Sequence, residues 1–122
     1  MLAHLLFDLA SPRGRMPRGA WLGRLVLLSV TALAFGMLAL EAAGNDGAAL
    51  VALFYLWCAA AASSRRLHDI SRSGWALLVA LIPAVGALWL LMLLLRPGAE
   101  GRNRYGEDPL ARLDYLRVDT SR

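Results

Sequence analysis

One long uncharged segment constrains the fold of this chain more than any other feature. Residues 75–95 contain no charged side chain and are almost wholly apolar. As a helix, at about 1.5 Å per residue, a segment of this length spans the roughly 30 Å hydrocarbon core of a bilayer. Two further apolar segments precede it, at residues 25–40 and 48–62. The sequence therefore predicts an integral membrane protein whose apolar surface is in contact with lipid.

The distribution of polar residues supports this interpretation. The chain has 122 residues, of which 58% are hydrophobic. In a soluble domain apolar and polar residues would alternate with helix or strand period, whereas here they form separate blocks. We expect a single all-α membrane domain, residues 1–122, built as an integral membrane bundle of three transmembrane helices with an N-terminal interfacial helix and a short folded C-terminal tail. The expected segments are an interfacial helix at 2–10, spans at about 18–42, 48–64 and 75–95, and a polar tail at 96–122.

Glycine and proline mark the expected turns. Residues 44–47 (Gly-Asn-Asp-Gly) predict a turn between the first two spans. Pro83 and Gly86 lie near the middle of the third span and predict a kink, with a re-entrant hairpin as the alternative. In the tail, Asp108 as N-cap and Pro109 at the first helical position predict a short final helix with Leu110, Leu113 and Leu116 on one apolar face.

The charges give conflicting indications of orientation. The net charge is +4, and all 13 basic residues are arginine. Arginines are concentrated in residues 1–24 and 63–74, which places both segments in the cytoplasm, with residues 41–47 outside. Three spans then place the tail outside, although its own arginines favour the cytoplasm. We favour three true spans with a cytoplasmic N-terminus; the alternatives are a re-entrant segment 75–95 and an inverted chain.

Several function classes lack the residues they need. A basic protein can bind nucleic acid, but no basic stripe with interleaved aromatic residues lies outside the spans, so no nucleic-acid partner is expected. Two histidines and one cysteine, Cys58 within an apolar segment, do not have the spacing of metal ligands. No glycine-rich phosphate loop follows a strand. The sequence thus predicts no metal and no cofactor.

The densest polar cluster lies at residues 65–75. If the second helix continues through it, Arg65, Asp69 and Arg72 share one face, with Asp69 between two guanidinium groups. His68 adds a group that changes charge near neutral pH. We favour an ionic contact that fixes the link between the second and third helices. The first alternative is a lipid-phosphate or anion site built from Arg65, Arg66 and Arg72, and the second is a proton relay or catalytic His–Asp pair with a nearby serine.

Three other groups of residues are candidates for contact sites. Interfacial anchors are expected at Arg15, Arg18, Trp21, Arg24 and Trp75. The small residues 59–64 favour close helix packing within the chain, with docking of a partner as the alternative. The tail carries a turn motif, and we expect its acids Glu100, Glu107 and Asp108 to pair with arginines of the 65–72 cluster. That turn motif consists of Gly101, Asn103, Tyr105, Gly106, Asp108 and Pro109.

Taken together, residues 65–75, the Pro83–Gly86 pair and residues 98–109 resemble the "domain of unknown function 805" family of bacterial inner-membrane proteins. The basic and aromatic residues at 14–21 are similar to that family's entry into its first helix, and the resemblance covers roughly residues 10–109. It implies a three-span, multi-pass protein of the bacterial inner (plasma) membrane. It brings no established activity and no catalytic residues.

The function expected on these grounds is non-enzymatic. We expect a small scaffold or accessory subunit whose partners are membrane lipids and other membrane protein subunits or a second copy of itself. The alternative is an oligomeric transporter of a small solute or ion with His68 and Asp69 at one mouth. Against it, the ionisable residues Arg24 and Glu41 lie at the ends of the spans, whereas transport pathways usually place such residues inside. The least favoured function is an interfacial lipid-acting enzyme that depends on His68, Asp69 and a nearby serine.

Overall fold

The computed structural model describes residues 1–111, and in this part of the chain every regular element is a helix. The all-α prediction is therefore confirmed. The elements, in chain order, are α1 (Leu2–Ala10), α2 (Arg18–Asp69), the 3-10 helix η1 (Gly74–Leu81) and α3 (Val85–Leu94).

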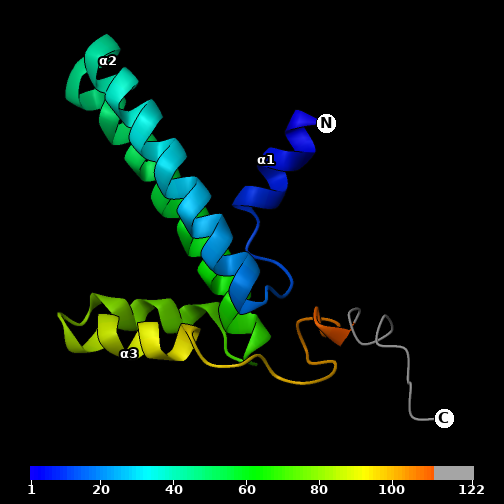
Figure 1. The fold of residues 1–122 in the computed structure, drawn as a ribbon. Coiled ribbons are helices and arrows are strands. Elements are labelled where there is room, and N and C mark those ends of the chain that lie inside the picture. The colour runs from blue at the N-terminus through cyan, green and yellow to red at the C-terminus, as the bar shows by residue number, and fades with distance from the viewer. Residues whose placement is uncertain (112–122) are drawn as a thin grey trace.

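Helix α2 is folded back on itself as two antiparallel arms (Figure 1). The break lies at Gly44, with φ 65° and ψ −153°, a backbone region that essentially only glycine adopts. The sequence predicted a turn over residues 44–47, but only Gly44 leaves the helical conformation, so the arms comprise residues 18–43 and 45–69. The arms contact each other along their length: Trp21 Nε1 donates to Ser63 Oγ at 3.1 Å, and the hydroxyls of Ser29 and Tyr55 lie 3.1 Å apart.

Residues 75–95 do not form the single helix predicted for a third span. The chain forms η1, turns at residues 82–84 and returns as α3, so that the two helices make a short hairpin lying across the end of α2 farthest from Gly44 (Figure 1). The cause is Pro83, because a residue before proline avoids the helical region and Ile82 is extended, with φ −75° and ψ 116°. Gly86 completes the turn, since a Cβ there would overlap the carbonyl oxygen of Val79.

Among the described residues, α2 is the one helix long and apolar enough to cross a membrane by length and composition, with a mean hydropathy of 2.1 in its most apolar window. Along its arms large apolar side chains face outward; Leu33 and Leu53, for example, are 68% and 63% exposed. No other described segment covers this surface.

A small core forms where α2, η1 and α3 meet. Ala62 is buried in it, and the neighbouring Ala61 is also buried, so these two small residues pack within the chain. The core cluster consists of Met16, Trp21, Ala62, Leu67, Leu90, Leu93 and Leu94.

Helix α1 covers Leu2–Ala10, and its large apolar residues Leu2, Leu5, Leu6 and Phe7 are exposed. Its contact with α2 is polar: the Asp8 carboxylate lies 2.8 Å from Arg24 Nη2 and 3.1 Å from Arg65 Nη1. The hydrogen bond from Arg24, together with the nearby charge of Arg65, holds the pKa of Asp8 below its usual value.

After α3 the chain returns to the same end of α2 as a loop. Asn103 and Gly106 exchange backbone hydrogen bonds of 3.0 and 3.1 Å, which closes a tight turn. The Asp108 carboxylate accepts from the Leu110 amide at 2.9 Å, as an N-cap does. The rest of the predicted final helix, with Leu113 and Leu116, lies outside the described residues.

Candidate functional site

The carboxylate of Asp69, the last residue of α2, is buried at the end of the helix. Arg66 Nη1 lies 2.5 Å from one of its oxygens, and Arg15 Nε donates to the other at 3.1 Å. The side chains of Arg15, Arg66 and Asp69 are at most 2% exposed. We call these three residues, with the backbone carbonyls that the arginines contact, the Asp69 cluster.

Arg66 joins α2 to the end of α3. It stands three residues before Asp69 on the helix, so both side chains project from one face. Its Nε donates to the Leu94 carbonyl at 2.8 Å, and its Nη2 donates to the Arg96 carbonyl. The last carbonyls of a helix have no partner within the helix, and a cation there also complements the helix dipole. Arg66 therefore terminates α3 as well as pairing with Asp69.

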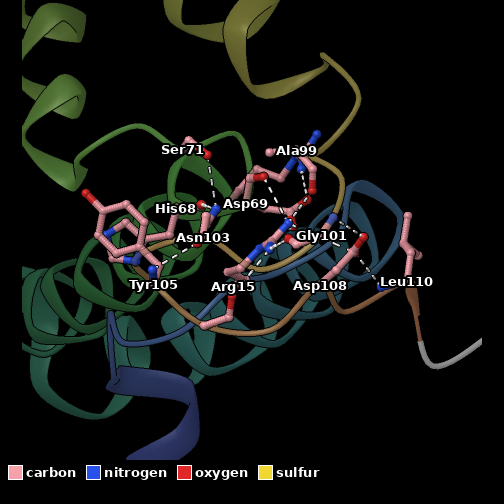
Figure 2. Close-up of polar contacts among 12 residues, drawn as sticks. Arg15, His68, Asp69, Ser71, Ala99, Gly101, Asn103, Tyr105, Asp108 and Leu110 are labelled. Carbon is pink, nitrogen blue, oxygen red and sulfur yellow. Dashed lines mark hydrogen bonds and ion pairs between the residues drawn. The ribbon is translucent and has the colours of Figure 1, made fainter.

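Arg15 joins the segment before α2 to the tail (Figure 2). Its Nη2 donates to the Ala99 carbonyl at 2.5 Å, and its Nη1 donates to the Gly101 carbonyl at 2.6 Å. The Ala99 amide in turn donates to the Asp69 carbonyl at 2.7 Å. Gly98 makes this approach possible, because a Cβ at that position would overlap the Asp69 carboxylate. The cluster thus connects three segments that are distant in the sequence.

The guanidinium groups around Asp69 differ from those that helical spacing predicts. Arg15 and Arg66 take the places expected for Arg65 and Arg72, because Arg65 pairs with Asp8 and the Arg72 residue is exposed. The Met16 amide donates to the Arg65 carbonyl at 3.1 Å, which holds the Arg15 segment against α2. Sequence spacing along one helix gave no signal for this contact between segments.

The predicted interfacial anchors have different surroundings. Arg15 and Trp21 are buried in the protein, at 8% and 3% exposure, which corrects their prediction as groups in contact with the lipid interface. Arg24 pairs with Asp8, and Arg18 Nη1 donates to the Leu95 carbonyl at 3.1 Å. Trp75 is 78% exposed at the start of η1.

The tail turn motif is folded against the end of α2, as expected, but its contacts are not the predicted ion pairs. Asn103 Nδ2 donates to the His68 carbonyl at 2.9 Å and to Ser71 Oγ at 3.2 Å, while its Oδ1 accepts from the Tyr105 amide (Figure 2). Of the three tail acids, Asp108 comes within 4.0 Å of Arg15 Nη2. Glu107 pairs with exposed Arg102 of its own loop.

Asp108 also holds the loop closed. Besides capping Leu110, its carboxylate accepts from the Gly101 amide at 3.0 Å. These backbone hydrogen bonds lower the pKa of Asp108. Pro109 follows it without a backbone donor of its own.

His68 faces away from the carboxylate next to it in sequence. Its Nδ1 lies 2.9 Å from the Gly14 carbonyl, and because a carbonyl only accepts, Nδ1 is the donor in this contact. Nε2 lies 3.5 Å from Ser64 Oγ, and the ring stacks on Tyr105 with centroids 3.8 Å apart. Burial lowers the pKa of His68; the hydrogen bond to the Gly14 carbonyl opposes this shift, and the charge of Arg104 adds to it. His68 is therefore neutral at pH 7 and is not paired with Asp69.

Metal binding has no structural support within residues 1–111, where no three His, Cys, Asp or Glu side chains come together to hold an ion.

The fold and the site define a small helical membrane protein. Its α2 arms are apolar, and at one end of α2 the polar groups are bonded to one another within the protein. The chain belongs to the family described as "Protein of unknown function (DUF805)", which matches residues 9–107 and therefore includes the whole Asp69 cluster. It is similar to "Inner membrane protein YhaH" of Escherichia coli K12, with 34% identity over 105 residues, 80% of this chain and 85% of that protein.

A second relative from the same organism, "Inner membrane protein YhaI", is 54% identical over 46 residues, which cover 37% of this chain and 38% of that protein. No solved structure matches. Family membership predicted from the motifs is thereby confirmed, and both relatives are named as inner membrane proteins.

Proposed function

We propose that α2 crosses the bacterial inner membrane twice and that the hairpin of η1 and α3 does not cross it. Each arm of α2, residues 18–43 or 45–69, is longer than the roughly 20 residues that a span requires. The η1–α3 hairpin consists of two short apolar helices at one end of α2 and suits a re-entrant or interfacial segment. This arrangement takes the place of the three spans expected from sequence.

The proposed topology also removes the conflict between the arginine-rich segments. The tail contacts Asp69 directly, so the tail and the 63–74 segment belong on one side of the membrane. The opposite end, around Gly44, carries Glu41 and Asp46 and no arginine. The positive-inside rule then places the Asp69 cluster, the start of α2 and the tail together in the cytoplasm.

Single-cysteine labelling tests this topology. Cys58 is fully buried and is replaced by serine in the starting variant. A cysteine at Asp46 is expected to react with a membrane-impermeant maleimide from the periplasmic side, and one at Glu107 from the cytoplasmic side. Labelling of the Glu107 position from the periplasm would overturn the proposal.

Within that topology the protein acts as a non-enzymatic scaffold or accessory subunit. One observation carries this proposal: the buried charges of the polar end are bonded to one another and to backbone carbonyls, while large apolar side chains along the α2 arms are exposed within residues 1–111. The Asp69 cluster holds the end of the molecule in a fixed shape, and the arms supply the surface for other membrane helices, from a partner or a second copy.

The alternative functions have less support. Residues 25–40 and 47–64 of α2 contain no Asp, Glu, Lys, Arg or His, whereas transport pathways place such groups within the membrane. A catalytic His68–Asp69 pair is not assembled, because the two side chains have different partners. A phosphate site built from Arg65, Arg66 and Arg72 conflicts with the internal partners of Arg66.

Site-specific photocrosslinking in native membranes tests the scaffold proposal. A benzophenone amino acid is placed at exposed Leu33 or Leu53, and at Leu67, which is fully buried, as the matched control. We expect one protein adduct of defined mass from at least one arm and none from Leu67; two differently tagged copies identify a self-adduct. Lipid adducts alone at both arms, or solute flux through liposomes that is lost in His68→Ala, would overturn the proposal.

A further inference from the structure

A cavity of 590 Å³ lies beside the second arm of α2, where η1 and the segment before α2 meet it. Small Ala60 and Ala61 on α2 leave the space, and Gly74 lets η1 begin against Ser64, because a Cβ there would overlap the serine hydroxyl. From this point η1 leaves α2 at a steep angle (Figure 1). The wall is mainly apolar, with Trp57, Ala60, Ala61, Trp75 and Leu77 contributed by the two helices.

The polar residues of this cavity favour an anion. Arg13 lines it and is exposed, while the lining contains no carboxylate among the described residues. Tyr105 also lines it, and the Arg104 guanidinium lies over the Tyr105 ring, with its carbon 4.9 Å from the ring centroid. Arg104 Nη2 also donates to the phenol oxygen at 2.7 Å. Two arginines thus stand at or next to the cavity.

The apolar wall continues onto surface that faces outward. Trp57 and Trp75 are 60% and 78% exposed. Trp75 lies beside the end of α2, where aromatic residues meet the membrane–water interface in the proposed topology, and Trp57 lies deeper, near the middle of the arm 45–69. A ligand that fits both parts needs an apolar chain and an anionic head, and the surrounding bilayer supplies such molecules.

We propose that this cavity binds one anionic phospholipid from the bilayer, with an acyl chain against Trp57, Ala60 and Leu77 and its phosphate at Arg13. The size agrees with that of cavities that hold one small ligand, about 300–1,000 Å³. Arginine bonds phosphate through its planar fork of donors. The inference rests on the proposed topology only for the placement of the cavity at the edge of the hydrocarbon region. It concerns different residues from the Arg65, Arg66 and Arg72 set expected from sequence.

Native mass spectrometry of the full chain in a mild detergent tests the proposal. With equal amounts of phosphatidylglycerol and phosphatidylcholine, we expect one retained phosphatidylglycerol per chain. Arg13→Ala should weaken this retention about tenfold, the loss expected for a charge-assisted hydrogen bond. Arg102→Ala removes the same charge but acts on a side chain that pairs with Glu107 and does not line the cavity, so retention should not change.

A second variant fills the cavity without changing its charge. Ala60 is exposed on α2, so Ala60→Trp places a large ring in the cavity and leaves the buried core intact; we expect it to abolish retention. Equal retention of both lipids, or equal loss in Arg13→Ala and Arg102→Ala, would overturn the proposed site. If either outcome were found while the photocrosslinking experiment still gave a protein adduct, the lipid site alone would be refuted. Selective retention without any protein adduct would refute the scaffold function alone.

Discussion

Two carboxylates in this protein each lie between two arginines, and they differ in burial. Asp69 contacts Arg15 and Arg66 with its side chain 2% exposed, whereas Asp8 contacts Arg24 and Arg65 with its side chain 57% exposed. Replacing either by asparagine removes one negative charge and keeps the shape of the side chain. The pair therefore separates the effect of burial from the effect of losing two ion pairs.

The expected costs differ. In Asp69→Asn two guanidinium groups remain buried side by side without a carboxylate between them, and breaking a buried ion pair in this way costs about 3–5 kcal/mol. Exposed ion pairs contribute about 0–1 kcal/mol each, so losing both in Asp8→Asn should reduce the free energy of unfolding by at most about 2 kcal/mol.

Two measurements check this difference. Unfolding in mild detergent by added dodecyl sulfate, followed by tryptophan fluorescence, gives the free energies of the three proteins. Hydrogen exchange of the Ala99 amide, which donates to the Asp69 carbonyl, reports the same contact locally and should accelerate at least about a hundredfold in Asp69→Asn. Equal destabilisation by the two substitutions, or unchanged exchange at Ala99, would refute the reasoning.

Three further predictions concern single contacts. Gly44→Ala should lower the melting temperature, because alanine in this backbone conformation costs about 1–3 kcal/mol, while Gly36→Ala should not, since its Cβ meets only Val51 Cγ1 at 3.9 Å. Gly98→Ala should displace the tail from the Asp69 carboxylate and expose the loop to trypsin, as seen by faster cleavage after Arg102. The folded protein holds the pKa of His68 below its value in the unfolded chain, about 6.5, so its stabilising contribution is present above that pH and is lost as pH falls. Between pH 7 and pH 5 the melting temperature should therefore fall more in the wild type than in His68→Gln. An equal fall in the two proteins would contradict this.

The sequence was informative where a residue's effect is local. In the sequence, residue 18 began the first expected span, Gly44 began the expected turn and Asp108 was the expected cap, and the structure has a helix start, a break and a cap at these residues. Each of these acts on its own backbone through conformation or hydrogen bonding, so single-residue chemistry is sufficient to predict it.

Contacts between distant segments could not be predicted in the same way. Hydropathy cannot distinguish one helix over residues 75–95 from two helices around Pro83, because both are equally apolar. The Arg15 contact with Asp69 depends on how the chain enters α2, and helical spacing carries no information on it. The family resemblance placed roughly residues 10–109 in a membrane protein family but implied no partner for Arg15 or Asp69.

The Asp69 cluster has a consequence for biosynthesis. Arg15 bonds residues that are 54 and 84 positions later in the chain, so its donors have no protein acceptor when it leaves the ribosome. In the topology proposed above, Arg15 and Arg66 would then add to the positive charge that retains their end of the nascent chain at the cytoplasmic face. Only synthesis of the loop through residue 101 supplies the carbonyls that later enclose Arg15, so the cluster forms after the two arms of α2 have been made.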